Sequence, residues 1–183
     1  MDSAVRAVSG NEILALVRLT HRLKSGAPVR ACMETGALLA GADAEVQAAL
    51  GAFGEAVGTS YQVIDDVLDL EGVIRGGKAT KRAGEDLLNG KATMPLAHAV
   101  DPLPQEQMRK LWRGLRDGRA GGRRVRRAVT VLRACGALEA STVEAHELLK
   151  GSWEHVGVLV GESAQAHALW TMAEQAVHRS RIA

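Results

Sequence analysis

Residues 43–70 carry apolar side chains at the period of an α-helix for most of their length. Spaced at 100° per residue, these side chains cover about half of the helix circumference. They are Phe53, Ala56, Val57, Val63, Ile64, Val67, Leu68 and Leu70. A helix on the surface of a globular protein would show a narrower apolar stripe. We therefore expect this segment to be a mostly buried helix.

The rest of the chain also has the pattern of a helical protein. Periodicity and helix start and stop signals predict helices at about 10–22, 27–41, 43–70, 93–99, 104–117, 122–134, 137–150 and 163–179. Residues 71–91 are expected to form a loop with a short helical turn, and no segment shows the alternation of a strand. The composition, with Gly 20 in 183 residues, favours helices that pack closely. We predict a single all-α domain over residues 1–183.

Polar side chains occupy the opposite side of the predicted helix 43–70. Asp65, Asp69, Gln62 and Asp66 lie there, and Gly58, one turn earlier, would leave room for a bulky anion. On a solvated helix, like charges four residues apart cost only about 0.2–0.5 kcal/mol. In a partly buried cleft, two such charges about 4 Å apart repel by about 4 kcal/mol. The three aspartates are therefore either a solvated acidic face or the ligands of a cation.

The tetrapeptide Gly-Lys-Ala-Thr occurs twice after this helix, at residues 77–80 and 90–93. Each copy presents a lysine, Lys78 or Lys91, on a loop that its glycine allows to bend. Carboxylate oxygens are the ligands that Mg²⁺ prefers, and lysines neutralise the charge of phosphate groups. Three aspartates followed by two lysines therefore predict a site for magnesium and a diphosphate.

These motifs resemble the second aspartate-rich region of trans-type polyprenyl diphosphate synthases, the relatives of farnesyl and geranylgeranyl diphosphate synthase. The matching segments are 58–69, 77–78, 84–87 and 90–95. Upstream, segments 21–27 and 35–41 are similar to the family's Lys-Thr helix, with Ser25 in place of the usual threonine. Tyr61 stands where the family usually has phenylalanine, and segments 136–139 and 177–179 fit its last helices.

The family's first Asp-Asp-x-x-Asp motif has no counterpart in this sequence. The chain thus resembles the C-terminal portion of such an enzyme. The resemblance implies an all-α fold, a partial isoprenoid-synthase-type helical bundle without the family's N-terminal helices. Helices without their usual neighbours would expose apolar surface, so we expect a homo- or hetero-oligomer.

The resemblance also implies a role for each matching residue. The implied metal ligands are Asp65 as the principal one, Asp69 directly or through water, and Asp66 in support. The implied substrate-binding residues are Lys24, Ser25, Gln62, Lys78 and Lys91. Four of these metal-binding and substrate-binding residues are also implied to be catalytic: Lys24, Gln62, Asp65 and Lys78.

The family reaction joins two substrates, an allylic diphosphate and isopentenyl diphosphate, with Mg²⁺ as the cofactor. The allylic diphosphate ionises, the double bond of isopentenyl diphosphate attacks, and a proton is lost. This chain would supply the second aspartate-rich site of such a prenyltransferase, and we do not expect it to be active alone. The alternative is a non-catalytic regulatory or diphosphate-binding subunit, or a truncated remnant of a synthase.

Composition argues against several other functions. We expect neither a signal peptide nor a transmembrane span, because no apolar run is long enough. The two cysteines are too few for a disulfide framework, so we expect a cytoplasmic protein. A net charge of +2 does not indicate a nucleic-acid partner, and the arginine-rich stretch 109–127 is predicted to be a solvated face. The sequence Gly72-x-x-x-x-Gly77-Lys78 is not a P-loop, because Ala79 follows it and a helix precedes it.

Overall fold

The structure is a computed structural model that describes residues 9–75, 78–81, 83–116 and 122–178. Its helices are α1 (Gly10–His21), α2 (Ala27–Leu39), α3 (Ala44–Glu71), α4 (Glu85–Leu88), α5 (Met94–His98), α6 (Gln105–Arg116), α7 (Gly122–Ala134), α8 (Ala137–Val160) and α9 (Ala164–Val177). A π-helical turn, η1 (Arg22–Gly26), joins α1 to α2. Two short antiparallel strands, β1 (Val73–Arg75) and β2 (Lys78–Lys81), follow α3. Apart from this hairpin the fold is all-α.

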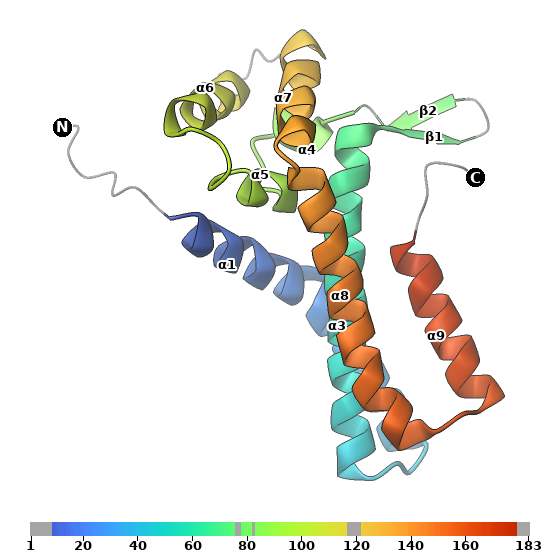
Figure 1. Cartoon of the computed structure of the whole chain (residues 1–183). Helices are drawn as coiled ribbons and strands as arrows, with labels where there is room; N and C mark the ends of the chain where they lie inside the picture. The colour runs from blue at the N-terminus through green and yellow to red at the C-terminus, as the bar shows by residue number, and fades with distance from the viewer. Residues whose placement is uncertain (1–8, 76–77, 82, 117–121, 179–183) are drawn as a thin grey trace.

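The long helices α3 and α8 run side by side through the molecule, and α9 packs against both (Figure 1). α2 lies along the first half of α3, where Met33 meets Gly54. One apolar core joins α3 to α8 and α9, with the Phe53 and Trp153 rings 5.1 Å apart. A second core surrounds Leu70 near the end of α3 and includes Leu132 of α7. Because α3 contributes to both cores, the prediction that it is mostly buried is confirmed.

Two predictions about local structure were wrong. Residues 71–91 contain the β1–β2 hairpin as well as the expected short helix α4. The helix predicted at 137–150 continues to Val160, and Gly161, with a φ of 65°, ends it. Gly151 does not interrupt α8, because the next turns bury Val156 and pack Trp153 against Phe53. Burial of these side chains outweighs the weak helix propensity of one glycine.

One side of α1 and η1 presents apolar side chains to solvent. Leu16, Leu19 and Leu23 are 62, 47 and 60% exposed. Leu19 also lines a groove formed by α1, η1, α3 and α8, together with Leu148. Contiguous exposed apolar surface of this kind usually marks a contact with another chain or segment. Among the described helices, none is both long and apolar enough to cross a membrane.

Candidate functional site

The candidate site is built on the second half of α3, which carries Gln62, Asp65, Asp66 and Asp69. Gln62, Asp66 and Asp69 are only 8, 3 and 1% exposed, and Asp65 is partly buried. A buried carboxylate requires hydrogen-bond donors or positive charge close by. Two segments supply them here: the end of α1 with η1, and the stretch 84–94 around α4.

Asp66 is held from both of these segments at once. Its Oδ2 atom lies 2.8 Å from Nε2 of His21, the last residue of α1. The same oxygen accepts a hydrogen bond of 2.9 Å from the backbone N–H of Met94 at the start of α5. Both partners are buried, so Asp66 fixes the position of α1 and α5 relative to α3. This arrangement suits the supporting role that the sequence resemblance implies for Asp66.

Asp69 and Lys91 are linked through Asp86. The backbone N–H of Asp86 donates to Asp69 Oδ2 at 3.1 Å, and the Asp86 carboxylate pairs with Nζ of Lys91. This carboxylate raises the pKa of Lys91, and the charges of Asp69 and Asp66 raise it further. Lys91 therefore lies in the field of all three carboxylates while its side chain remains 57% exposed. An exposed ammonium group beside buried acids is available to an anionic ligand.

The turn η1 brings Lys24 and Ser25 to α3 about one turn before Asp66. The Ser25 hydroxyl donates to Oε1 of Gln62 at 3.1 Å, so these two predicted residues do lie together. Lys24, the preceding residue, is exposed. Single π-helical turns occur often at functional sites, because the wider turn changes the direction of the side chains that it carries.

Gly58 has a different role from the one predicted. It does not leave room for an anion, because the η1 backbone occupies the space beside it. A Cβ atom at Gly58 would lie 2.7 Å from the Ser25 carbonyl carbon and 2.9 Å from the Gly26 Cα atom. Carbon atoms in contact are normally about 3.5–4.0 Å apart. Glycine at this position lets η1 approach α3 closely enough for Ser25 to reach Gln62.

The donors present fit a divalent cation that is shared with a phosphate ligand. Asp65 and Asp69 are four residues apart on α3 and therefore face the same side. Mg²⁺ is commonly bound by one or two carboxylates together with water and substrate phosphate oxygens. Among the residues that the structure describes, no three or more acidic, His or Cys side chains converge on one point. Lys78 begins β2, but its side chain lies outside the described part of the structure.

A family model described as polyprenyl synthetase matches residues 16–132, which include the whole candidate site. The chain belongs to this family. Octaprenyl diphosphate synthase of Escherichia coli (strain K12) is 28% identical over 193 residues, covering 99% of this chain and 58% of the relative. Heptaprenyl diphosphate synthase component 2 of Geobacillus stearothermophilus is 39% identical over 79 residues, covering 43% of this chain and 24% of the relative.

Solved polyprenyl synthases share the fold. The structure of polyprenyl synthase from Caulobacter crescentus CB15, complexed with calcium and isoprenyl diphosphate, matches with a TM-score of 0.81 and 27% identity. That match covers 96% of this chain and 52% of the other. This polyprenyl synthetase chain therefore has the all-α isoprenoid synthase fold. It spans about half the length of the relatives that it matches, which fits the C-terminal portion of a synthase.

Two residues of the site were not given a role from the sequence. His21 and Asp86 lie inside segments that carry the resemblance. No spacing in the sequence links either residue to the aspartate that it contacts. His21 contacts Asp66, 45 residues away, and Asp86 contacts Asp69, 17 residues away. The sequence showed only that His21 lies three residues before Lys24 and Asp86 five residues before Lys91. The contacts with Asp66 and Asp69 depend on the fold.

Proposed function

We propose that this chain supplies the second aspartate-rich, magnesium-diphosphate site of a polyprenyl diphosphate synthase. The enzyme would join an allylic diphosphate to isopentenyl diphosphate in the cytoplasm. One observation carries the proposal. The α1–η1 segment, through His21 and Ser25, and the α4–α5 segment, through Asp86, attach to consecutive turns of α3 that hold the three aspartates. Lys91 lies in the electrostatic field of Asp66 and Asp69, and Lys24 lies on η1 next to Ser25.

In this proposal each side chain has a defined task. Lys24, Lys78 and Lys91 bind the diphosphate of the allylic substrate and stabilise the charge that develops on it as it leaves. Gln62, whose side chain is fixed by Ser25, orients the reacting end of the substrate. Mg²⁺, held by Asp65 and Asp69, would add Lewis-acid stabilisation of the same leaving group. Asp66 keeps these turns of α3 in place through its contact with His21.

A partner chain is part of the proposal. The match covers 58% of the octaprenyl diphosphate synthase, and another relative is named as component 2 of a heptaprenyl diphosphate synthase. The exposed Leu16, Leu19 and Leu23 on α1 and η1 offer an apolar surface on which such a partner could pack. A homo-oligomer would cover the same surface. The alternative is a non-catalytic subunit that binds diphosphate and regulates a complete synthase.

The first test is calorimetry of magnesium diphosphate binding. Asp65→Ala is expected to abolish binding, because it removes the principal proposed ligand of the cation. Glu45→Ala is the matched control: it removes one carboxylate from the same helix, in its exposed first turn, and should leave binding unchanged. Binding retained by the Asp65→Ala protein would refute the metal site.

A second test separates the enzyme from the regulatory subunit. The tagged chain is purified with whatever partner it retains from its source cells, and incorporation of isopentenyl diphosphate into product is measured. An enzyme whose site lies on this chain should lose incorporation in the Asp65→Ala complex and keep it in the Glu45→Ala complex. Equal incorporation by both complexes would favour the non-catalytic role.

A further inference from the structure

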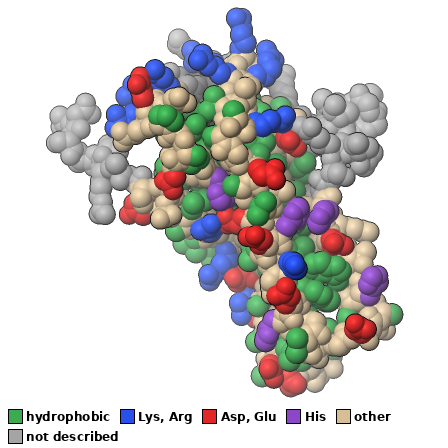
Figure 2. Space-filling model, in the orientation of Figure 1, with side chains coloured by type: hydrophobic (Ala, Val, Ile, Leu, Met, Phe, Trp, Pro, Cys, Tyr) green, Lys and Arg blue, Asp and Glu red, His purple; other side chains and the backbone are tan. Residues whose placement is uncertain are grey.

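Basic side chains gather on the outer side of α6 and α7, at the end of the molecule remote from the α8–α9 turn (Figures 1 and 2). We define the α6–α7 basic face by its exposed cationic residues. They are Arg109, Lys110 and Arg113 on α6, and Arg123, Arg124, Arg126 and Arg127 on α7. The whole chain has a net charge of only +2, so this face is strongly positive by comparison. Such asymmetry indicates an anionic partner.

This concentration of positive charge does not stabilise α7. Its inner side buries Val125, Ala128 and Leu132 against the second core. Among its exposed residues, Arg123 stands three and four residues before Arg126 and Arg127, and like charges at these spacings destabilise a helix. Among the side chains that the structure describes, none of these three arginines has an acidic partner in an ion pair. An external anion would relieve the repulsion.

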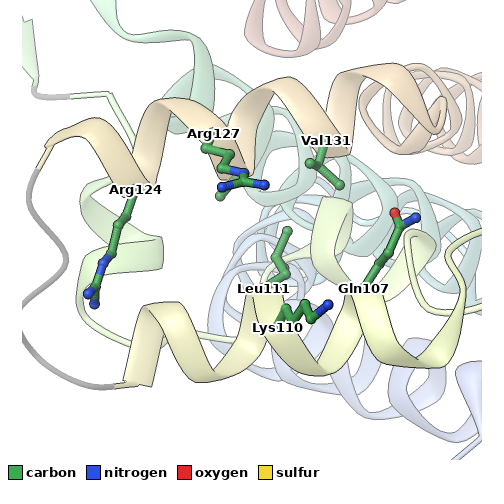
Figure 3. Close-up of a pocket in the computed structure, with 7 residues that line it drawn as sticks. Gln107, Lys110, Leu111, Arg124, Arg127 and Val131 are labelled. Atoms are coloured by element: carbon green, nitrogen blue, oxygen red, sulfur yellow. The ribbon is translucent and has the colours of Figure 1, made fainter.

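A groove runs between the two helices and combines positive charge with apolar surface. Figure 3 shows Gln107 and Leu111 of α6 pointing toward α7, and Arg127 and Val131 of α7 pointing toward α6. Lys110 and Arg124 complete the charged lining, and Ala128 adds to the apolar part. Trp112, which follows Leu111 on α6, is 37% exposed. Basic side chains beside apolar groups and a partly exposed tryptophan suit the headgroup region of a lipid bilayer.

We infer that the α6–α7 basic face docks on the surface of a membrane that contains anionic phospholipids. The cations are spread along two helices, which suits an extended anionic surface better than one small phosphate compound. Nucleic acid is a weaker fit, because Trp112 is the one aromatic side chain of α6 and α7 and single-stranded binding relies on several. The docking is peripheral, and it does not depend on the proposed enzymatic function.

Co-sedimentation with lipid vesicles tests the inference. The chain should bind vesicles of phosphatidylcholine with phosphatidylglycerol and should not bind vesicles of phosphatidylcholine alone. Each basic residue near such a surface contributes roughly a fivefold factor in affinity, so Arg124→Gln with Arg127→Gln should weaken binding about thirtyfold. Raising the salt concentration should also release the protein, because the charges become screened.

A matched control removes the same charge elsewhere. Arg22→Gln with Lys150→Gln takes two exposed cations from η1 and α8, and this variant should bind anionic vesicles within about threefold of the wild type. Thermal melting of both variants checks that each is folded. The inference would be overturned if both double variants lost binding to anionic vesicles to the same extent. It would also be overturned if the wild type bound neutral and anionic vesicles equally well. Tighter binding to a nucleic-acid duplex than to anionic vesicles at the same salt concentration would overturn it as well.

Discussion

Replacing Gly58 with alanine tests how α3 is joined to the turn that carries Lys24 and Ser25. The added Cβ atom would lie 2.7 Å from the Ser25 carbonyl carbon and 2.9 Å from the Gly26 Cα atom. Both are backbone atoms, so no side chain can rotate away. To restore normal contact, η1 must move from α3 by roughly 0.8–1.3 Å.

The expected magnitude follows from two opposing effects. Alanine gains about 1 kcal/mol over glycine in a helix interior. Overpacking a tight contact costs about 1–3 kcal/mol, and the backbone contact here places Gly58 at the upper end of that range. We expect a net loss of about 1–2 kcal/mol in the free energy of unfolding. For a chain of this size, that lowers Tm by about 2–8 °C.

Gly151→Ala is the control, because it makes the same change in the interior of another long helix. Apart from its chain neighbours and the nearby backbone of its own helix, no atom lies within 4 Å of a Cβ built on Gly151, and this residue of α8 is exposed. We expect a gain of about 0.5–1 kcal/mol, which raises Tm by roughly 1–4 °C. The two alanine variants should therefore shift Tm in opposite directions.

Thermal unfolding followed by circular dichroism measures both shifts at one pH and one protein concentration. Calorimetry with magnesium diphosphate adds a functional readout, since movement of η1 would displace Lys24 and Ser25 from α3. Gly58→Ala should weaken this binding and Gly151→Ala should not. The reasoning would be refuted if Gly58→Ala melted at or above the temperature of the wild type.

Two further predictions concern charged groups. Asp86→Asn removes the carboxylate that positions Lys91, so magnesium diphosphate affinity measured by calorimetry should fall about five- to tenfold; unchanged affinity would mean that the pair has no part in binding. For Glu144 on α8, burial opposes ionisation, but hydrogen bonds from Arg18 and His98 outweigh it and lower its pKa from 4.5 to about 2. Stability from Glu144 is therefore present above pH 4.5 and is lost as the pH falls toward 2. Urea unfolding across this range should show a shallower pH dependence for Glu144→Gln, and parallel profiles would contradict the assignment.

Most of the fold could be predicted because its signals are local. Helix α3 begins after Asp43, whose side chain accepts from the Val46 N–H, and α9 begins after Ser163 in the same way. Such caps and the 3.6-residue period can be recognised without tertiary information. The β1–β2 hairpin could not, because its strands are short and show no alternation of apolar and polar residues. The full length of α8 depends on packing against α3, which the sequence does not display.

The sequence predicted which residues form the candidate site better than it predicted the contacts between them. The spacing of Asp65, Asp66 and Asp69 identifies the acidic side of α3 from the sequence. The spacing does not show that the three aspartates differ in their contacts. That difference arises because His21 and the Met94 N–H reach Asp66. These partners lie 45 and 28 residues from Asp66 along the chain. Only the packing of α1 and α5 on α3 brings them together.

The difference between Asp66 and the other two aspartates affects how the proposed site would bind its ligand. Oδ2 of Asp66 already accepts from two buried groups, so this carboxylate is poorly placed to act as a third equal ligand. A cation at Asp65 and Asp69 would then need water or phosphate oxygens to complete its shell. The exposed Lys91 would meet that phosphate from the α5 side, and Lys24 from η1. On this reasoning the proposed site would bind magnesium and diphosphate together, with the cation on the α3 acids and the lysines on the phosphate oxygens.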